Sequence, residues 1–278
     1  MMRKLRKLAL AAVWDSPFEH VLRTTLARLS LAQKDRYDRE LDAVMTSALR
    51  PDSNCVDVGC YRGEVLRRIL KLAPRGKHFA IEPVRENHAY LARKFPAARI
   101  FNMALSDYSG RAAFQHVVDR PARSGLLKVD YPDPRQEVRE VSIDVGTLDG
   151  VIPAGVRIDF IKIDVEGAEL AVLRGGRKLI RKYQPMIAFE HGYERARTYG
   201  DTPEHMYDLL AGELGLRIAL MKSWLRGHGD MRRDEFLRHV YDKLDFSFLA
   251  YSSVPHLTTP SRGGRRAAAQ GPQSSTWG

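Results

Sequence analysis

An acidic residue and two glycines follow one another at the end of the first apolar segment with strand character. Asp57 lies in this segment, residues 54–58, Gly59 comes directly after it, and Gly63 opens the next predicted helix. Glycine permits a sharp turn and a close approach of the backbone to a ligand, and the first turn of a helix presents unpaired N–H groups. In a doubly wound sheet, such a turn borders the crevice where ligands bind. The stretch predicts a ligand-binding turn, and a strand–turn–helix with a purely structural role is the alternative.

The residue types of this turn favour a ligand without phosphate groups. The glycines are spaced Gly-x-x-x-Gly rather than Gly-x-Gly-x-x-Gly, as in dinucleotide-binding turns, and Tyr61 would crowd a pyrophosphate. The carboxylate of Asp57 would repel phosphates, whereas it suits an amino group. S-adenosylmethionine carries an α-amino group and a sulfonium and has no phosphate. The pattern therefore favours S-adenosylmethionine over NAD as the cofactor.

A second carboxylate stands at the end of the next predicted strand. Glu82, which is followed by Pro83, lies about 20 residues after the glycine turn, an offset at which an acid can accept hydrogen bonds from ribose hydroxyls. A solvated glutamate at a strand end is the alternative. Its offset from this turn makes Glu82 the candidate for binding the ribose of the cofactor.

Two later strands end in side chains that could move a proton. Asp164 follows the segment 158–163, whose apolar residues indicate burial on both faces, and the segment 185–190 ends at Glu190, directly before His191. A transfer to a hydroxyl group needs a base for the departing proton. His191 is the candidate base because imidazole titrates near neutral pH, with Glu190 and Asp164 as its catalytic partners. A histidine with a structural role is the alternative.

The same edge carries enough carboxylates for a metal ion. Asp164, Glu166 and Glu190 could hold Mg²⁺, which prefers oxygen ligands, although the sequence does not require a metal. Glu166 and Glu169 also lie where we expect the first turn of the following helix, in which the helix dipole favours acids. Lys162 is unusual inside an apolar strand, and we expect it to pair with one of these acids or to reach the surface.

A parallel sheet is needed to bring these side chains to one edge. After residue 53, short apolar strands alternate with helices, which is typical of an α/β fold with helices on both faces of the sheet. We expect a doubly wound, mostly parallel, seven-stranded, Rossmann-like sheet. The predicted strands are 54–58, 78–82, 99–103, 158–163, 185–190, 216–221 and 246–252, and two further strand-like segments are 112–118 and 138–145. The predicted helices are 63–72, 85–94, 167–180 and 203–213.

The rest of the chain divides around this sheet. Residues 1–52 are predicted to form a helical N-terminal extension, residues 53–252 the main domain, and residues 253–278, rich in Gly, Pro and Ser, a disordered tail. Residues 119–137 separate the two extra strand-like segments and are expected to form a lid over the site. The helical spacing of the extension is carried by Leu22, Leu26 and Leu29 and by Leu41, Val44, Met45 and Leu49.

The net charge of +11 is concentrated at the two ends of the chain. Residues 1–10 carry four basic residues and no acid, and residues 253–278 carry three basic residues and no acid. The charge of the remaining chain is therefore ordinary for its size, and nucleic acid is not favoured as a partner. The basic and then apolar residues 1–14 could lie against an anionic membrane surface, with a cleaved signal peptide as the alternative.

The composition fits a globular protein of a reducing compartment. Hydrophobic residues make up 44% and charged residues 28% of the 278 residues, enough for a sizeable core. The longest apolar runs fall well short of the roughly 18 residues of a membrane-spanning helix. Cys55 and Cys60 give no basis for a disulfide framework, so we expect a cytoplasmic protein, at the inner face of a membrane if residues 1–14 bind lipid. The oligomeric state is not indicated.

Several segments together resemble one family. The glycine turn with Glu82-Pro83 resembles the start of class I S-adenosylmethionine-dependent methyltransferases. The block IDFIKIDVEGAEL (158–170) is similar to the FkbM-type family of these enzymes. Further segments that resemble this family are NMALSDYSG (102–110), VGTLDGVI (145–152) and QPMIAFEHG (184–192), so the resemblance runs from about Asn54 to His191.

The resemblance implies a set of cofactor contacts. It places the adenine beside the turn after the third strand and the methionine part beside the glycine turn. In this family Ala-Asn commonly follows the first glycine, whereas Cys60 and Tyr61 stand there, which leaves contacts to the cofactor's carboxylate to backbone amides. The residues that the resemblance assigns to the cofactor are Asp57, Gly59, Cys60, Gly63, Glu82, Pro83, Ala104, Leu105, Ser106, Asp107 and Asp164.

The resemblance also implies the chemical class of the acceptor. It indicates O-methylation of a hydroxyl group on a sugar, a glycolipid or a related polyhydroxylated small molecule. Enzymes that methylate exocyclic amino groups of bases typically carry Asn/Asp-Pro-Pro-Tyr/Phe after the fourth strand, and this chain has Asp164-Val165-Glu166-Gly167 there. Two alternatives stay open: an RNA methyltransferase that uses the basic termini, and a non-catalytic cofactor-binding module in glycan assembly.

Overall fold

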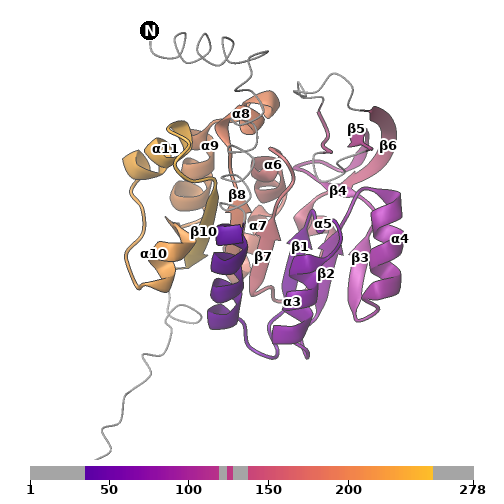
Figure 1. The fold of residues 1–278 in the computed structure, drawn as a ribbon, viewed down its shortest axis with the longest axis horizontal. Helices are drawn as coiled ribbons and strands as arrows, with labels where there is room; N and C mark the ends of the chain where they lie inside the picture. Colours follow the sequence, from indigo (N-terminus) through magenta and orange to yellow (C-terminus); the bar gives the residue numbers. More distant parts are fainter. Residues whose placement is uncertain (1–34, 119–123, 128–136, 253–278) are drawn as a thin grey trace, which may run out of the picture.

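The computed structural model describes residues 35–118, 124–127 and 137–252. A seven-stranded sheet in the order β3-β2-β1-β7-β8-β10-β9 forms the centre of the molecule, with helices on both of its faces (Figure 1). This confirms the predicted doubly wound α/β fold. Residues 1–34, most of the insertion 119–137 and the tail 253–278 lie outside the described residues, and the expectations for them stay predictions.

The sheet is parallel except for one strand. β10 runs antiparallel to both of its neighbours, β8 and β9, while the other paired strands run parallel. Each of the seven predicted segments overlaps one strand. The strands are β1 (Cys55–Val58), β2 (His78–Ile81), β3 (Ala98–Phe101), β7 (Phe160–Ile163), β8 (Met186–Glu190), β9 (Leu216–Ala219) and β10 (Ser247–Ser252).

Successive residues of the central strands face different helical layers. Ile161 and Ile163 of β7 pack in a core cluster with residues of α5 (Leu148–Val151), α6 (Glu169–Arg174), α7 (Arg177–Tyr183) and α11 (Arg233–Tyr241). Phe160 of β7 packs in another cluster with the helix 35–48, α3 (Glu64–Leu72) and α10 (Met221–Leu225). Because strand side chains alternate between faces, Lys162 belongs to the layer of the helix 35–48.

The helix 35–48 is part of this core. Its apolar residues Leu41, Val44 and Met45 are buried, as their spacing predicts, and they share a cluster with Met186 of β8 and Leu249 of β10. The described part of the N-terminal extension therefore packs against the sheet rather than forming a unit of its own.

Two of the predicted helices have different bounds in the structure. The segment 167–180 divides into α6 and α7 at Gly175, where a Cβ would lie 2.1 Å from the carbonyl oxygen of Ser106, so the chain is packed too closely for any other side chain. The segment 203–213 begins as α9 (Pro203–Tyr207) and continues as a π-helix, Asp208–Glu213. The helix predicted over 85–94 is α4 (Arg85–Lys94), and a short helix α8 (Tyr193–Ala196) follows β8.

A second, three-stranded sheet in the order β4-β6-β5 lies beside the carboxyl ends of the parallel strands. β5 (Gly110–Val117) and β6 (Val138–Gly146) form the antiparallel pair that the strand-like segments predict. The third main strand ends at Phe101 rather than at 103, and β4 (Ala104–Leu105) pairs with β6 instead. The turn after β3 is thus fixed between the two sheets.

None of the helices in the described ranges combines the length and apolar character needed to cross a membrane.

Candidate functional site

The glycine turn after β1 requires its two glycines for different reasons. Gly59 has φ +80°, and a Cβ on it would lie 2.0 Å from the backbone oxygen of Asp164, so the turn packs directly against the end of β7. Gly63 has φ +76°, and its Cβ would lie 2.5 Å from the ring of Phe95. Gly59 shapes the site, whereas Gly63 allows α3 to pack against its neighbours.

Asp57 is a buried carboxylate with unused acceptor capacity. It is 2% exposed, and within the described part of the chain its Oδ2 has no hydrogen-bond partner. Burial raises the pKa of Asp57 to about 7, an effect that Lys162 opposes and Asp164 reinforces. An orphaned acceptor of this kind is rare in a folded protein and suits a ligand that brings its own donor.

Glu82, at the end of β2, is held in a fixed orientation. Its side chain accepts hydrogen bonds from the backbone N–H groups of Tyr61 (2.9 Å) and Val84 (2.9 Å) and from Nδ2 of Asn87 (3.3 Å). Burial raises its pKa, and these hydrogen bonds counteract the rise. Since two carboxylate oxygens offer about four acceptor positions, Glu82 retains capacity for a ligand hydroxyl.

An apolar cavity lies between Glu82 and the second sheet. Its lining includes Gly59, Tyr61 and Glu82, and its many apolar lining residues suit an aromatic ring. Ala104 and Leu105 line it, as the adenine prediction requires. Ser106 and Asp107 are not among its described lining residues. The remaining lining residues are Val58, Ile81, Pro83, Val84, Phe114, Ser124, Gly125, Leu126, Asp164, Val165, Glu166 and Ala168.

The described piece of the insertion, residues 124–127, covers this apolar cavity. Gln115 and Gly125 exchange backbone hydrogen bonds of 2.8 and 3.2 Å, and the Ser124 hydroxyl accepts from the N–H of Val117 at 3.0 Å. The Tyr199 hydroxyl accepts from the N–H of Leu127 at 3.3 Å. The insertion was expected to form a lid, and its described residues contribute to the apolar cavity.

A polar cavity of about 430 Å³ opens on the other side of the glycine turn. The side chains of Asp57, Lys162, Asp164 and Glu190 reach it from the ends of three neighbouring strands. The helix 35–48 contributes further lining residues to it. The two cavities share Gly59, Tyr61, Asp164 and Glu166, so one molecule could extend from the apolar cavity into the polar one.

Lys162 organises the charges of the polar cavity. Its Nζ lies 3.3 Å from Oδ2 of Asp164. Although burial disfavours its charged form, the attraction of Asp164, Glu190 and Asp57 raises the pKa of Lys162. The pKa of Glu190 lies above the ordinary carboxyl range because of burial and of repulsion from Asp164. A buried cation therefore faces three carboxylates, of which Asp57 and Glu190 hold a proton more tightly than usual.

His191 is not among the described residues that line either cavity. It is 1% exposed, its ring lies 6.3 Å from that of Phe236 at an interplanar angle of 17°, and its backbone N–H donates to the carbonyl of Phe246 at 2.7 Å. Burial lowers its pKa to about 4. The expectation that His191 stands in the site beside Glu190 is therefore corrected: alternation along the chain directs the two side chains to opposite layers.

The acids proposed as metal ligands do not converge. In residues 35–118, 124–127 and 137–252, no group of three His, Cys, Asp or Glu side chains could hold a metal ion. Glu166 forms an ion pair with Arg195. The positive charge that a cation would bring beside Asp164 and Glu190 is already supplied by Lys162. These residues do not fit the Mg²⁺ site that the sequence suggested.

The segment after β7 also differs from its prediction. Glu166 lies in a turn at φ +61° instead of starting a helix, and α6 begins at Glu169. The buried carboxylate of Glu169 accepts hydrogen bonds from the N–H groups of Val165 (3.2 Å) and Gly167 (3.0 Å). Burial raises the pKa of Glu169 to about 7. Its contacts fix the turn that carries Asp164 and Glu166.

The sequence did not assign a role to three residues that line the polar cavity. Lys162 was noticed as a charge in an apolar strand, but its position between several acids depends on strand order. Tyr37 and Asp38 also line the polar cavity. They belong to the helix 35–48, which precedes β1 and the glycine turn in the sequence. Cys60 lines this cavity as well and, like Cys55, is a buried free thiol.

Part of the chain is similar in sequence to a named methyltransferase. Over 152 residues the chain is 32% identical to the 2-O-methyltransferase NoeI of Sinorhizobium fredii (strain NBRC 101917 / NGR234), a match that covers 48% of this chain and 61% of that protein. The chain thus spans less than two thirds of the length of that relative.

Solved structures of methyltransferases are similar to the chain at low sequence identity. Methyltransferase FkbM from Methylobacillus flagellatus KT is 20% identical, with a TM-score of 0.46 over 73% of this chain and 44% of that chain. A TehB-like SAM-dependent methyltransferase from Corynebacterium glutamicum is 12% identical, with a TM-score of 0.40 over 82% of this chain and 97% of that chain.

A family model supplies the assignment. Residues 57–218 match the model described as the methyltransferase FkbM domain, and this range begins at Asp57 of the glycine turn and ends in β9. It includes Glu82, Lys162, Asp164 and Glu190, which reach the two cavities. The chain therefore belongs to the methyltransferase FkbM domain family.

Proposed function

We propose that this protein is an S-adenosylmethionine-dependent O-methyltransferase that acts on a hydroxyl group of a sugar, a glycolipid or a related polyhydroxylated molecule. The observation that supports it most is the meeting of the apolar and polar cavities at Gly59 and Asp164. A donor and an acceptor bound in adjoining cavities would be held as methyl transfer requires, because such a transfer depends mainly on alignment.

The residues around Gly59 fit the cofactor. The apolar cavity with Ala104 and Leu105 would hold the adenine, and Glu82 would accept hydrogen bonds from the ribose. The orphaned Oδ2 of Asp57 would accept from the α-amino group, directly or through water. When bound, S-adenosylmethionine supplies a methyl group already activated by its sulfonium.

The proton of the acceptor hydroxyl would pass to Glu190. Its carboxylate lines the polar cavity, and its raised pKa brings it closer to neutral pH, where a general base is most effective. Lys162 would hold Asp164 and Glu190 in place and favour the ionised form of Glu190 before the transfer. The carboxylate of Glu190 would take up and keep this proton, while the cofactor held by Asp57 and Glu82 would supply the methyl group.

The acceptor class rests on the chemistry of the polar cavity and on the relative. The relative NoeI is a 2-O-methyltransferase, which supports a hydroxyl as the acceptor group. The polar cavity combines charged acceptors and donors with the aromatic residues Tyr37 and Phe246, a mixture that suits a molecule with many hydroxyl groups. We therefore place hydroxyl methylation ahead of other methyl acceptors.

Calorimetry with S-adenosylhomocysteine tests the cofactor assignment. Glu82→Ala should weaken binding about 10- to 100-fold, because hydrogen bonds to a charged group each contribute roughly 1.5–3 kcal/mol. Glu86→Ala is the matched control, since Glu86 is an exposed acid in the first turn of α4. Absent binding to the wild type, or equal losses in both variants, would contradict the proposal.

Transfer itself is measured with S-adenosylmethionine that carries a deuterated methyl group. The purified chain is incubated with a panel of methyl glycosides and short oligosaccharides, and products are detected by mass spectrometry. A trideuteromethyl ether on a sugar hydroxyl supports O-methylation. Binding of S-adenosylhomocysteine together with no labelled product across the panel would instead support the non-catalytic alternative.

A further inference from the structure

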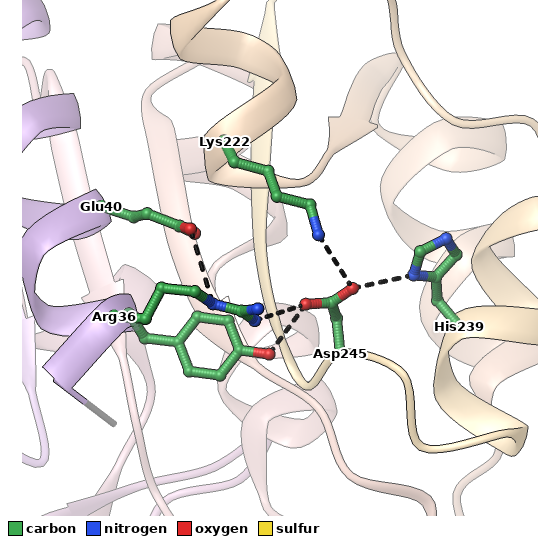
Figure 2. Close-up of polar contacts among 6 residues, drawn as sticks. Arg36, Glu40, Lys222, His239 and Asp245 are labelled. Atoms are coloured by element: carbon green, nitrogen blue, oxygen red, sulfur yellow. Dashed lines mark hydrogen bonds and ion pairs between the residues drawn. The ribbon is translucent and has the colours of Figure 1, made fainter. Parts of the chain in front are cut away.

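Asp245 joins the helix 35–48 to two distant parts of the chain. It lies between α11 and β10, is 4% exposed, and accepts hydrogen bonds from Nη2 of Arg36 and the hydroxyl of Tyr37, both at 2.9 Å (Figure 2). Nδ1 of His239 in α11 lies 3.0 Å from its other oxygen, and Nζ of Lys222 in α10 lies 3.6 Å from that oxygen. One buried carboxylate thus connects three helices.

Several residues that contact Asp245 or follow it in the chain line one wall of the polar cavity. Tyr37 lines the cavity while its hydroxyl reaches Asp245, and its ring packs edge-on against that of Phe246 with centroids 4.4 Å apart. Phe246 and Ser247, the residues after Asp245, line the same cavity, as does Met221 beside Lys222. The helix 35–48, α10 and the start of β10 therefore all contribute to this wall, whereas α11 supplies none of its described lining residues.

The helix 35–48 also extends the cavity. A groove between this helix and α3 shares Asp38, Leu41, Glu64 and Val65 with the polar cavity. An acceptor that reaches from Asp164 toward the surface would therefore follow this helix. The orientation of the helix decides the width of both the cavity and the groove.

We infer that Asp245 is a positioning residue for acceptor binding, acting through Tyr37 and Phe246 by fixing the helix 35–48 as one wall of the acceptor site. This inference rests on the proposed function, since it takes the polar cavity as the acceptor site. Stability alone is a weak explanation for the network, because a buried ion pair can often be replaced by apolar groups at little cost. A fixed wall explains why one carboxylate joins the helix 35–48 to α10 and to the start of β10, all of which line the polar cavity.

Asp245→Asn and Tyr37→Phe test the inference. Asp245→Asn keeps the shape of the side chain but weakens its contacts with the cations, and Tyr37→Phe removes a single donor from it. For Asp245→Asn, the KM for the best glycoside acceptor should rise about tenfold, while kcat and the Kd for S-adenosylhomocysteine stay within about threefold of the wild type.

Tyr37→Phe should show a smaller rise in KM and serves as the test if Asp245→Asn does not fold. Asp208→Asn is the control, as Asp208 pairs with Arg233 at the surface.

Hydrogen exchange gives a readout that needs no acceptor. In Asp245→Asn with S-adenosylhomocysteine bound, the amides of residues 35–48 and 246–247 should exchange about tenfold faster, whereas those of β1 and β2 keep their protection. A uniform loss of protection, or a parallel loss of acceptor and cofactor binding, would overturn the inference and leave Asp245 a general structural residue. An unchanged KM would overturn it too. If the wild type methylates no acceptor, the proposed function fails, and the exchange pattern still decides whether Asp245 fixes this wall.

Discussion

Lys162 and Asp164 form an ion pair at the carboxyl end of the buried strand β7, with Nζ of the lysine 3.3 Å from Oδ2 of the aspartate. The lysine side chain is 9% exposed and the aspartate side chain 38%, so the pair connects the interior of the sheet to the polar cavity. Asp57 of β1 lies opposite Lys162 in the sheet register. The ammonium is thus placed beneath the carboxylates at the carboxyl end of the sheet.

Lys162→Met should destabilise the protein and remove activity. Without the cation, the charges of Asp57, Asp164 and Glu190 would repel one another. Loss of one partner from a fully buried ion pair costs about 3–5 kcal/mol, and the lower end of this range applies because Asp164 is partly exposed. We expect a loss of this order in the free energy of unfolding by urea at neutral pH. Lys178→Met, at an exposed lysine of α7, is the control and should stay within about 0.5 kcal/mol of the wild type.

The pH dependence of the stability of Lys162→Met follows from the titration of Asp57. The pKa of Asp57 is about 7 in the fold against an ordinary value of 3.8, so the folded state binds more protons between these values. Loss of the Lys162 cation raises the folded pKa of Asp57 further, so the deficit of Lys162→Met should grow as the pH rises above 7, where wild-type Asp57 loses its proton and Asp57 of the variant still holds it. A deficit that stays constant with pH would show that Lys162 acts through packing alone.

Glu190→Gln should abolish most turnover without loss of cofactor binding. Removal of a general base typically lowers kcat by about 10²–10⁴-fold, and we expect a decrease in this range with the Kd for S-adenosylhomocysteine unchanged. In the wild type, kcat/KM should rise with pH as Glu190 loses its proton, with a midpoint above the ordinary carboxyl range because burial raises its pKa. This rise should be missing in Glu190→Gln. Glu213→Gln, at a surface ion pair with Arg177, should keep both the rate and the profile.

Gly59→Ala should be far more damaging than Gly155→Ala. Both glycines have positive φ, +80° and +84°, so both substitutions meet the same backbone strain of about 1–2 kcal/mol. Only Gly59 adds a clash, with its Cβ 2.0 Å from the oxygen of Asp164, while no atom of the described residues lies within 4 Å of a Cβ at Gly155. We expect Gly59→Ala to lose binding of S-adenosylhomocysteine, measured by calorimetry, and Gly155→Ala to retain it. Equal behaviour of the two variants would mean that the close packing of the glycine turn on β7 is unimportant for the ligand.

His191→Leu should alter the pH dependence of stability and keep turnover. The pKa of His191 is about 4 in the fold against an ordinary value of 6.5, so the unfolded state binds the extra proton between these values. The wild type should therefore lose up to about 3 kcal/mol of stability from this group as the pH falls from 6.5 to 4, and the variant should lose none of it. Urea unfolding of both proteins across this pH range separates the contribution of His191 to stability from the contributions of the acidic residues. A kcat reduced by orders of magnitude in His191→Leu would restore the histidine as the base.

Much of the sheet edge could be predicted from the sequence. Strand periodicity, the glycine turn and the acids after the strands are local features, and parallel strands bring their carboxyl ends to one edge. Asp57, Glu82, Asp164 and Glu190 accordingly reach the two adjoining cavities. The division of 167–180 into two helices was not predictable, because Gly175 is required by its contact with Ser106, a residue far away in the sequence.

The sequence by itself determined the α/β fold, the family and the acids at the ends of the strands, because each depends on residue types at short spacing. Only the tertiary structure decided which neighbouring side chains share a cavity. Glu190 faces the layer of the helix 35–48, whereas His191 packs against Phe236 in the other layer. The helix 35–48 and Asp245 meet because the antiparallel strand β10 begins where β8 ends. Strand order, strand direction and the placement of helices on the two faces fix these contacts, and all three arise from packing between distant segments.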